Sequence, residues 1–418
     1  MGGMSQMPMT SPTNTGIPRS PMARKLATDG HYYAFLIFYL VALSALGSFV
    51  NDMYSPALPG MSRFFGCSIS TAQMGLSMGM MGLAVGQLVL GPLSDRRGRK
   101  PVLIGSLTVF IVAAVASIFS PTIHVFNLCR FFQGLGAAGG YFLARTIPAD
   151  VYGGRPLAKL MALIGAINGI APASAPVIGG VTADAFGWKA IFVVLALFAL
   201  AVLALSPLMK ESLGPSKRLT GPLSATLKGY RNLLTAKPFM VHVCLKGTAL
   251  GLLFAYISTA PFILQTHYGL SQTVYGLVIG FNALFVAAGS MAALRFRLLK
   301  RAAVVGAWIT VAGIVAEAIA LCTVHSIWLF EGCMVVALFG LGNIFTASNT
   351  LAMNEGRAQA GEASSILGIA GYIVGAIVTP LVGLGNIMHS SAITFVALAV
   401  IVLFFASITA KIPADLKK

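Results

Sequence analysis

Charged residues are scarce in this sequence. Lys, Arg, Asp and Glu make up 9% of its 418 residues, whereas 57% are hydrophobic and the mean hydropathy is +0.86. A soluble protein of this length would have about a quarter charged residues. Apolar runs of roughly 20 residues recur along the whole chain, and this length crosses a bilayer as a helix. We therefore predict an all-α, multi-pass membrane protein.

Other chemical signals are also missing. The five cysteines stand singly, so the sequence shows neither a disulfide framework nor a metal-binding spacing. The period-2 alternation typical of an outer-membrane barrel is not visible. No Ser/His/Asp arrangement or nucleotide-binding pattern appears. We therefore predict no enzyme, no metal site, no cofactor and no ATP-driven pump.

Twelve segments are predicted to span the membrane, in two halves of six. They cover residues 32–57, 70–91, 101–120, 123–146, 158–182, 187–208, 239–265, 273–295, 302–323, 326–352, 361–386 and 389–411. A basic, polar linker at 209–238 separates the halves, which cover 31–208 and 239–411. Residues 1–30 are predicted to be a disordered cytoplasmic tail, and 412–418 a second cytoplasmic tail.

The two halves resemble weak repeats. Pro59, Gly75 and Gly91 in the first half match Pro261, Gly276 and Gly289 in the second. Two six-helix halves related by a repeat are a recurring transporter plan, with the substrate site between them near the middle of the membrane. We predict two pseudo-symmetric six-helix bundles.

Basic residues are concentrated on one side of the predicted spans. Of the 28 Lys and Arg residues, 24 fall in one set of loops and tails, and only Arg63 and Lys189 fall in the other. Positive charge marks the cytoplasmic side, so both termini are predicted to be cytoplasmic. The same distribution accounts for the net charge of +17 through contact with anionic lipid rather than with nucleic acid.

The densest group of charges is the short turn from Gly91 to Pro101. It contains Asp95, Arg96, Gly98 and Arg99 between two apolar segments. One acid among four bases, with glycines that permit a tight turn, predicts a salt-bridged, helix-capping latch at the membrane surface. The corresponding turn of the second half, 295–301, has bases but no acid.

Two charged residues within the first half are candidates for coupling. Asp52 lies in the outer part of the first span, and burial favours the protonated form of a carboxyl group, as a proton carrier requires. The alternative is that the span ends at Val50 and Asp52 is an ordinary surface residue. Arg130 lies at a similar depth in the fourth span, so the two could interact. The alternative for Arg130 is a structural role with backbone carbonyls.

Other polar residues within the spans could line a substrate cavity, although each could equally form an interhelical hydrogen bond. They are Asn51, Tyr54, Gln133, Tyr141, Asn168, Tyr256, Asn282 and Asn343. Lys246 is expected to extend to the cytoplasmic surface. Glu317 and Glu331 are expected to have an interfacial or helix-pairing role, because both lie near the outer ends of their spans.

Four motifs in order resemble those of the major facilitator superfamily. The turn Gly91–Lys100 resembles its loop signature, Arg130–Gly134 its span-4 motif, and Ala171–Gly180 its span-5 antiporter motif. Asp52–Pro59 is similar to the span-1 motif of proton-driven drug exporters, especially the Bcr/CflA group of bicyclomycin- and chloramphenicol-type exporters, and the multidrug transporter MdfA is similar in the same places.

This resemblance implies a drug/proton antiporter that works by alternating access. Asp52 would be the proton-coupling acid with Arg130 as its functional partner, and Asp95 and Arg96 would hold the outward-facing state by joining helix ends across the halves. In the antiporter motif, Pro172, Pro176, Gly179 and Gly180 would shape the helix and limit leak.

The sequence departs from this pattern in two places. Ala171 and Ala175 replace glycines of the antiporter motif, and Ser44 and Ala45 stand where MdfA-like proteins have a second acid. A single acid in the first span favours neutral or zwitterionic substrates.

We therefore expect a monomeric exporter of small, moderately lipophilic drugs in the bacterial cytoplasmic membrane. Its expected partners are the substrate, protons and membrane lipid. Export of a metabolite such as a nucleoside or amino acid, and proton-coupled uptake, are the alternatives. A receptor or scaffold that transports nothing would have no use for Asp52.

Overall fold

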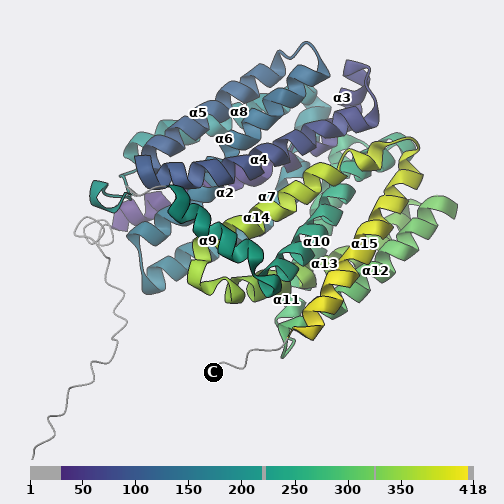
Figure 1. Ribbon diagram of the computed structural model, residues 1–418. Helices are drawn as coiled ribbons and strands as arrows, with labels where there is room; N and C mark the ends of the chain where they lie inside the picture. Colours follow the sequence, from purple (N-terminus) through teal and green to yellow (C-terminus); the bar gives the residue numbers. More distant parts are fainter. Residues whose placement is uncertain (1–29, 219–222, 324–325, 413–418) are drawn as a thin grey trace, which may run out of the picture.

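The computed structural model describes residues 30–218, 223–323 and 326–412. Within these ranges twelve helices have at least 18 residues, and they form two bundles of six (Figure 1). The first bundle contains α2 (Gly30–Asp52), α4 (Ile69–Arg97), α5 (Arg99–Ile118), α6 (Ile123–Val151), α7 (Gly154–Phe186) and α8 (Trp188–Leu205). The second contains α10 (Lys237–Pro261), α11 (Gln272–Ala293), α12 (Leu299–Thr323), α13 (Ile327–Glu355), α14 (Ala360–Val378) and α15 (Ile387–Lys411). The predicted fold class is confirmed.

The composition of these helices suits a membrane. Eleven of the twelve are long and apolar enough to cross a bilayer. The exception is α6, whose Arg130 and glycine-rich middle lower its hydropathy. Large apolar side chains, including Phe38, Val112, Trp308 and Phe404, are exposed on the outside of the helices. Apolar patches on this scale call for a lipid environment.

The pseudo-symmetry of the bundles is visible in their helix crossings. At Gly82 of α4, an added Cβ would meet the carbonyl of Phe131 on α6, and at Gly289 of α11 it would meet the carbonyl of Phe339 on α13. Gly289 therefore corresponds to Gly82, not to Gly91 as the sequence match predicted. The sequence match aligned glycines near the segment ends, whereas close packing requires the glycine at the crossing point.

Several predicted boundaries are wrong at the helix ends. The segment predicted as 32–57 ends as a helix at Asp52, followed by a 3-10 turn (Ser55–Ala57) and the short helix α3 (Leu58–Phe65). The segment predicted as 361–386 ends as α14 at Val378, followed by a 3-10 turn (Leu381–Gly383). Prolines 56 and 380 account for these endings, because proline cannot donate the next helical hydrogen bond.

The segments outside the bundles are only partly described. The predicted linker 209–238 contains the helix α9 (Leu223–Thr235), which packs against α10 and α14. The predicted tails lie outside the described residues, apart from their innermost positions.

The two bundles contact each other at the end where α2 ends and α4 begins. There, Ser70 donates to the carbonyl of Pro380 (2.8 Å), and Gln73 donates to the carbonyl of Ser258 (2.9 Å). Gln265 donates to the carbonyl of Pro56 (2.9 Å). The positive-charge pattern predicts that this end is periplasmic, so the structure is closed at its predicted periplasmic end.

Candidate functional site

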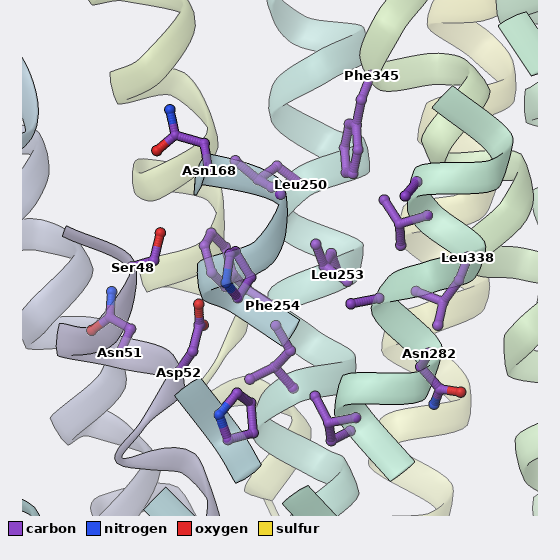
Figure 2. Close-up of a pocket in the computed structure, with 18 of the residues that line it drawn as sticks. Ser48, Asn51, Asp52, Asn168, Leu250, Leu253, Phe254, Asn282, Leu338 and Phe345 are labelled. Atoms are coloured by element: carbon purple, nitrogen blue, oxygen red, sulfur yellow. The ribbon is translucent and has the colours of Figure 1, made fainter. Parts of the chain in front are cut away.

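A cavity of about 530 Å³ lies between the two bundles. Helices α2, α6 and α7 form one side, and α10, α11, α13 and α14 form the other. Its walls are mostly apolar or small, with side chains such as Leu250, Leu253, Phe254 and Leu338 (Figure 2). A concave, largely apolar site with a few polar groups is the usual form of a small-molecule site.

Asp52 is placed on the wall of this cavity by the end of α2. It is the last residue of the helix and is 8% exposed, so it is not an ordinary surface residue. The helix end is stabilised by Ser55, whose hydroxyl donates to the carbonyl of Asp52 (3.0 Å). Among the described residues that line the cavity, Asp52 alone can carry a carboxylate charge. In Figure 2, Asp52 and Asn282 lie on opposite walls.

Arg130 is fully buried and does not bond to Asp52 in this conformation. Its guanidinium donates to the carbonyl of Val50 (2.6 Å), to Oδ1 of Asn51 (3.0 Å), to the carbonyl of Gly75 (3.4 Å) and to the side chain of Gln133. It therefore satisfies a carbonyl in the last turn of α2 and joins α2, α4 and α6. The structural alternative for Arg130 is thus part of its role, and any coupling to Asp52 passes through the neighbouring residues 50 and 51.

The aromatic ring of Tyr54 completes this cluster. The guanidinium carbon of Arg130 lies 4.8 Å from the centre of that ring, within range of a cation–π interaction. Gly75 leaves room for it, since an added Cβ would lie 2.7 Å from the Tyr54 hydroxyl. Tyr54 is fully buried and packs against Phe126 and Phe192, so its ring belongs to the core of the first bundle.

Five of the eight predicted polar cavity residues line the cavity. They are Asn51, Tyr141, Asn168, Tyr256 and Asn282. The other three do not. Tyr54 and Gln133 are buried with Arg130, and Asn343 is 1% exposed, with its amide donating to the carbonyl of Phe339 on its own helix (3.1 Å). A polar residue on a span can face a neighbouring helix as readily as a cavity. The sequence does not determine how each helix is rotated about its axis.

Some lining residues were missed in the sequence. Ser48, Ser290 and Tyr372 add polar groups, and Phe254 and Phe345 add aromatic surface. Ser48 precedes Asp52 by four residues, about one helical turn, so the position of Asp52 could have identified it. Tyr372 stacks with Phe254, with 6.0 Å between ring centres. The sequence around Tyr372 contains no feature that would have identified it as a cavity residue.

The charged turn 91–101 folds as a network within the first bundle. Arg99 pairs with Asp95 (2.5 Å) and with Asp150 at the end of α6 (2.9 Å). Gly98 has φ of 102°, a conformation that favours glycine. Because Gly98 has no side chain to cap α5, the carboxylate of Glu211 accepts from the backbone N–H groups of Arg99 (2.9 Å) and Lys100 (3.2 Å).

The network differs from the predicted latch in its partners. Asp95 pairs with Arg99, four residues later in the same turn, and not with a described residue of the second bundle. Arg96 is exposed in the last turn of α4. The ion pair of Asp95 with Arg99 therefore lies within the first bundle in this conformation. The sequence reading also missed Glu211, which lies more than a hundred residues away in the chain.

The antiporter motif lies where α7 meets α11 of the other bundle. An added Cβ on Gly180 would meet the carbonyl of Gln272, and one on Gly276 would meet the carbonyl of Pro176. Gly179 faces the carbonyl of Met53 just after α2. Pro172 and Pro176 line the cavity. The motif therefore brings the backbones of the two bundles into contact beside the cavity.

Comparison with known proteins identifies the family. The chain matches the Major Facilitator Superfamily over residues 38–380, and it belongs to this superfamily. It is 33% identical over 389 residues to the uncharacterized MFS-type transporter YdgK of Bacillus subtilis (strain 168), covering 90% of this chain and 95% of that protein. It is 30% identical over 344 residues to the multidrug resistance protein MdtL of Shigella flexneri, covering 80% and 85% of the two chains. The protein is therefore a multi-pass membrane transporter.

Solved structures agree with this fold. A bacterial homolog of the human lysosomal transporter Spinster, inward-facing and occupied, superposes with a TM-score of 0.74 at 15% identity, covering 91% of this chain and 97% of the other. The xylose transporter XylE from E. coli, partially occluded and inward open, gives a TM-score of 0.71 at 13% identity, covering 93% and 99%.

Proposed function

We propose that this transporter is a proton-coupled antiporter that exports small, moderately lipophilic molecules, with amphenicol- or bicyclomycin-like antibiotics as the first candidates. The observation that carries the proposal is the placement of Asp52 on the wall of a largely apolar cavity between the bundles. A carboxylate within a membrane span costs about 2.5–3.5 kcal/mol on insertion scales, so its presence there suggests a transport role.

The relatives and the motifs support drug export. The MdtL proteins bear the name multidrug resistance protein, and the four motifs resemble those of the Bcr/CflA group. We place the protein in that group, as a monomer in the bacterial cytoplasmic membrane with both termini in the cytoplasm.

The lining of the cavity favours neutral or zwitterionic substrates. Its polar groups are mostly amides and hydroxyls, such as Asn168, Asn282 and Tyr372, which hydrogen-bond to uncharged molecules. Ser44, at the position of the second acid in MdfA-like proteins, donates to Asn168 (2.7 Å). In this proposal Asp52 is protonated in one conformation and releases its proton in the other.

Arg130 acts on Asp52 through the backbone in this mechanism. It holds the carbonyl of Val50 and the side chain of Asn51, the two residues before Asp52. Because Arg130 holds the end of α2 within the first bundle, movement of this bundle against the second would move Asp52 between environments, and protonation of Asp52 would favour that movement. The halves 31–208 and 239–411 are the proposed moving units.

The test begins with a panel of drug susceptibilities in an efflux-deficient host, followed by transport in proteoliposomes. With chloramphenicol as the probe and an imposed pH gradient, we expect the wild-type protein to exchange drug for protons. The variant Asp52→Asn keeps the size of the side chain and removes its titrating group, so its gradient-driven transport should fall to the level of empty vesicles.

The control is Glu355→Gln, which neutralises an exposed acid at the end of α13. It should transport at the wild-type rate. Unchanged gradient-driven transport by Asp52→Asn would rule out the coupling role of Asp52. Drug movement in the same direction as protons would show uptake rather than export.

A further inference from the structure

A second set of carboxyl groups lies inside the other bundle. Glu331 on α13 accepts a hydrogen bond from Nδ2 of Asn282 on α11 (2.7 Å). It also accepts from the hydroxyl of Tyr256 on α10 (3.2 Å to the nearer oxygen). The Tyr256 hydroxyl in turn accepts from Asn282 (2.6 Å). Three helices thus place a tyrosine and an amide around one carboxyl group.

Glu317 on α12 is the second acid of this set, and its environment is different. It is fully buried, and neither of its carboxyl oxygens has a hydrogen-bond partner. A close crossing of α12 and α13 brings it near Glu331, since an added Cβ on Gly313 would lie 2.7 Å from the backbone nitrogen of Ala337. The two carboxyl groups lie within electrostatic range of each other.

No basic side chain offsets these acids among the described residues that interact with them. The titratable groups that face the pair are Tyr256, Tyr275 of α11 and Cys333 of α13. On the other packed helices, α14 has Glu362 and Tyr372, and α15 has His389 near its start and Lys411 at its end. Two ionised carboxylates side by side in a low-dielectric interior would repel each other, so the pair favours a state that holds a proton.

The cavity reaches this pair through its hydrogen-bond partners. Tyr256 and Asn282 both line the cavity, and Figure 2 shows Asn282 on the wall opposite Asp52. Glu331 bonds directly to both, so one polar side chain separates the cavity from its carboxyl group. Asp52 belongs to the first bundle and is absent from this network of bonds.

We propose that the pair Glu317 and Glu331 binds one exchangeable proton and forms a second proton site, reached from the cavity through Tyr256 and Asn282. The proton binds to a carboxylate oxygen and gives a neutral carboxyl group; no other bond forms or breaks. The donors on Glu331 stabilise its ionised form, so Glu317, which has none, holds the proton. The proposal rests on proton-coupled transport and gives each bundle its own proton site.

Infrared spectroscopy tests the proposal without any substrate. The full-length protein in lipid vesicles is titrated with acid and base, and the carbonyl stretch of protonated carboxyl groups is recorded. We expect a band that appears on acidification, survives in Asp52→Asn and Glu355→Gln, and is lost in Glu317→Gln. Glu331→Gln should change the frequency and the midpoint of the remaining Glu317 band.

A second variant covers the case in which Glu317→Gln fails to fold. Asn282→Ala removes a donor to Glu331 and leaves both acids in place, so it should move the midpoint of the band. The proposal is overturned if all bands persist in Glu317→Gln, if Asn282→Ala leaves the midpoint unchanged, or if the band responds to sodium ions rather than to pH.

The experiment separates this proposal from the proposed function. Loss of transport in Asp52→Asn with an intact second band supports both. If the protein shows the expected band but moves no protons with the drug, the second proton site is retained and the proposed antiport function is rejected.

Discussion

At the scale of single residues, Arg130 is a structural centre of the first bundle. It is fully buried, and its planar guanidinium reaches carbonyls or side chains on α2, α4 and α6 at once. A lysine carries the same charge but lacks the planar set of N–H donors of a guanidinium, so it would leave several of these partners unsatisfied. The coupling role proposed for Arg130 would therefore be joined to a role in stability in the same side chain.

Arg130→Lys should lower the stability of the folded protein. Unsatisfied buried polar groups cost about 1–3 kcal/mol each, and at least one of Val50 O and Asn51 Oδ1 would lose its donor. The measurement is thermal unfolding in detergent. Arg63→Lys, an exposed arginine, is the control and should change stability by no more than about 0.5 kcal/mol. Equal unfolding temperatures for both variants would contradict the structural role.

The sequence predicted that Asp52 and Arg130 lie at a similar level, which agrees with the bonds of Arg130 to Val50 and Asn51, but it did not predict these contacts. Depth follows from residue number, because each helical residue rises about 1.5 Å. Direction does not, because neighbouring residues point about 100° apart around a helix. Asn51 and Asp52 both line the cavity, but their side chains point in different directions, and it is the Asn51 side chain that bonds to Arg130. The network of Glu331 with Tyr256 and Asn282 was missed for the same reason, since it needs the rotations of three helices.

At the scale of helices, glycine determines how closely the spans pack. Gly134 of α6 lies against the backbone of Gly79 on α4, where an added Cβ would meet the Gly79 carbonyl. Hydropathy identified the spans well, because a span needs roughly 20 apolar residues whatever its neighbours. It could not identify these crossings, since many glycines of the sequence have open space beside them.

Gly134→Ala should separate α4 from α6 and disturb Arg130 one turn away. Overpacking costs about 1–3 kcal/mol, which outweighs the gain of up to about 1 kcal/mol from replacing glycine by alanine within a helix. The matched control is Gly105→Ala on α5, where an added Cβ meets nothing within 4 Å. Thermal unfolding should show destabilisation for Gly134→Ala and equal or greater stability for Gly105→Ala; the opposite order would refute the packing argument.

At the scale of the whole molecule, the two bundles are joined by polar contacts at one end. Asp184 of α7 accepts from the backbone nitrogen of Thr273 (2.8 Å), from its hydroxyl (2.6 Å) and from the nitrogen of Gln272 (3.3 Å). It therefore caps α11 of the other bundle, and its bonds join the bundles at the closed end.

Asp184→Ala should shift the protein toward the conformation that opens this end. Loss of a capping side chain costs about 0.5–2 kcal/mol, which corresponds to about a two- to thirty-fold change in population. A cysteine placed at the buried Ser258 in a cysteine-free background reports the opening through its rate of labelling by an impermeant maleimide. Thr182→Ala is the control, because its hydroxyl bonds only to its own helix. Equal labelling rates would show that Asp184 does not hold the end closed.

The contact of α7 with α11 has a mechanical consequence. Along it, Gly180 faces the carbonyl of Gln272, and Gly280 faces that of Ala173, where an added Cβ would lie 2.7 Å away. The two backbones approach each other closely at these glycines, and the side chain of Val177 also lies close to Gly280. Such a contact offers little steric resistance to relative movement, so in the proposed alternating-access cycle it would serve as a bearing on which the bundles rock. A large side chain at Gly280 would act as a wedge in this bearing, arresting the motion while leaving the polar groups of the cavity in place.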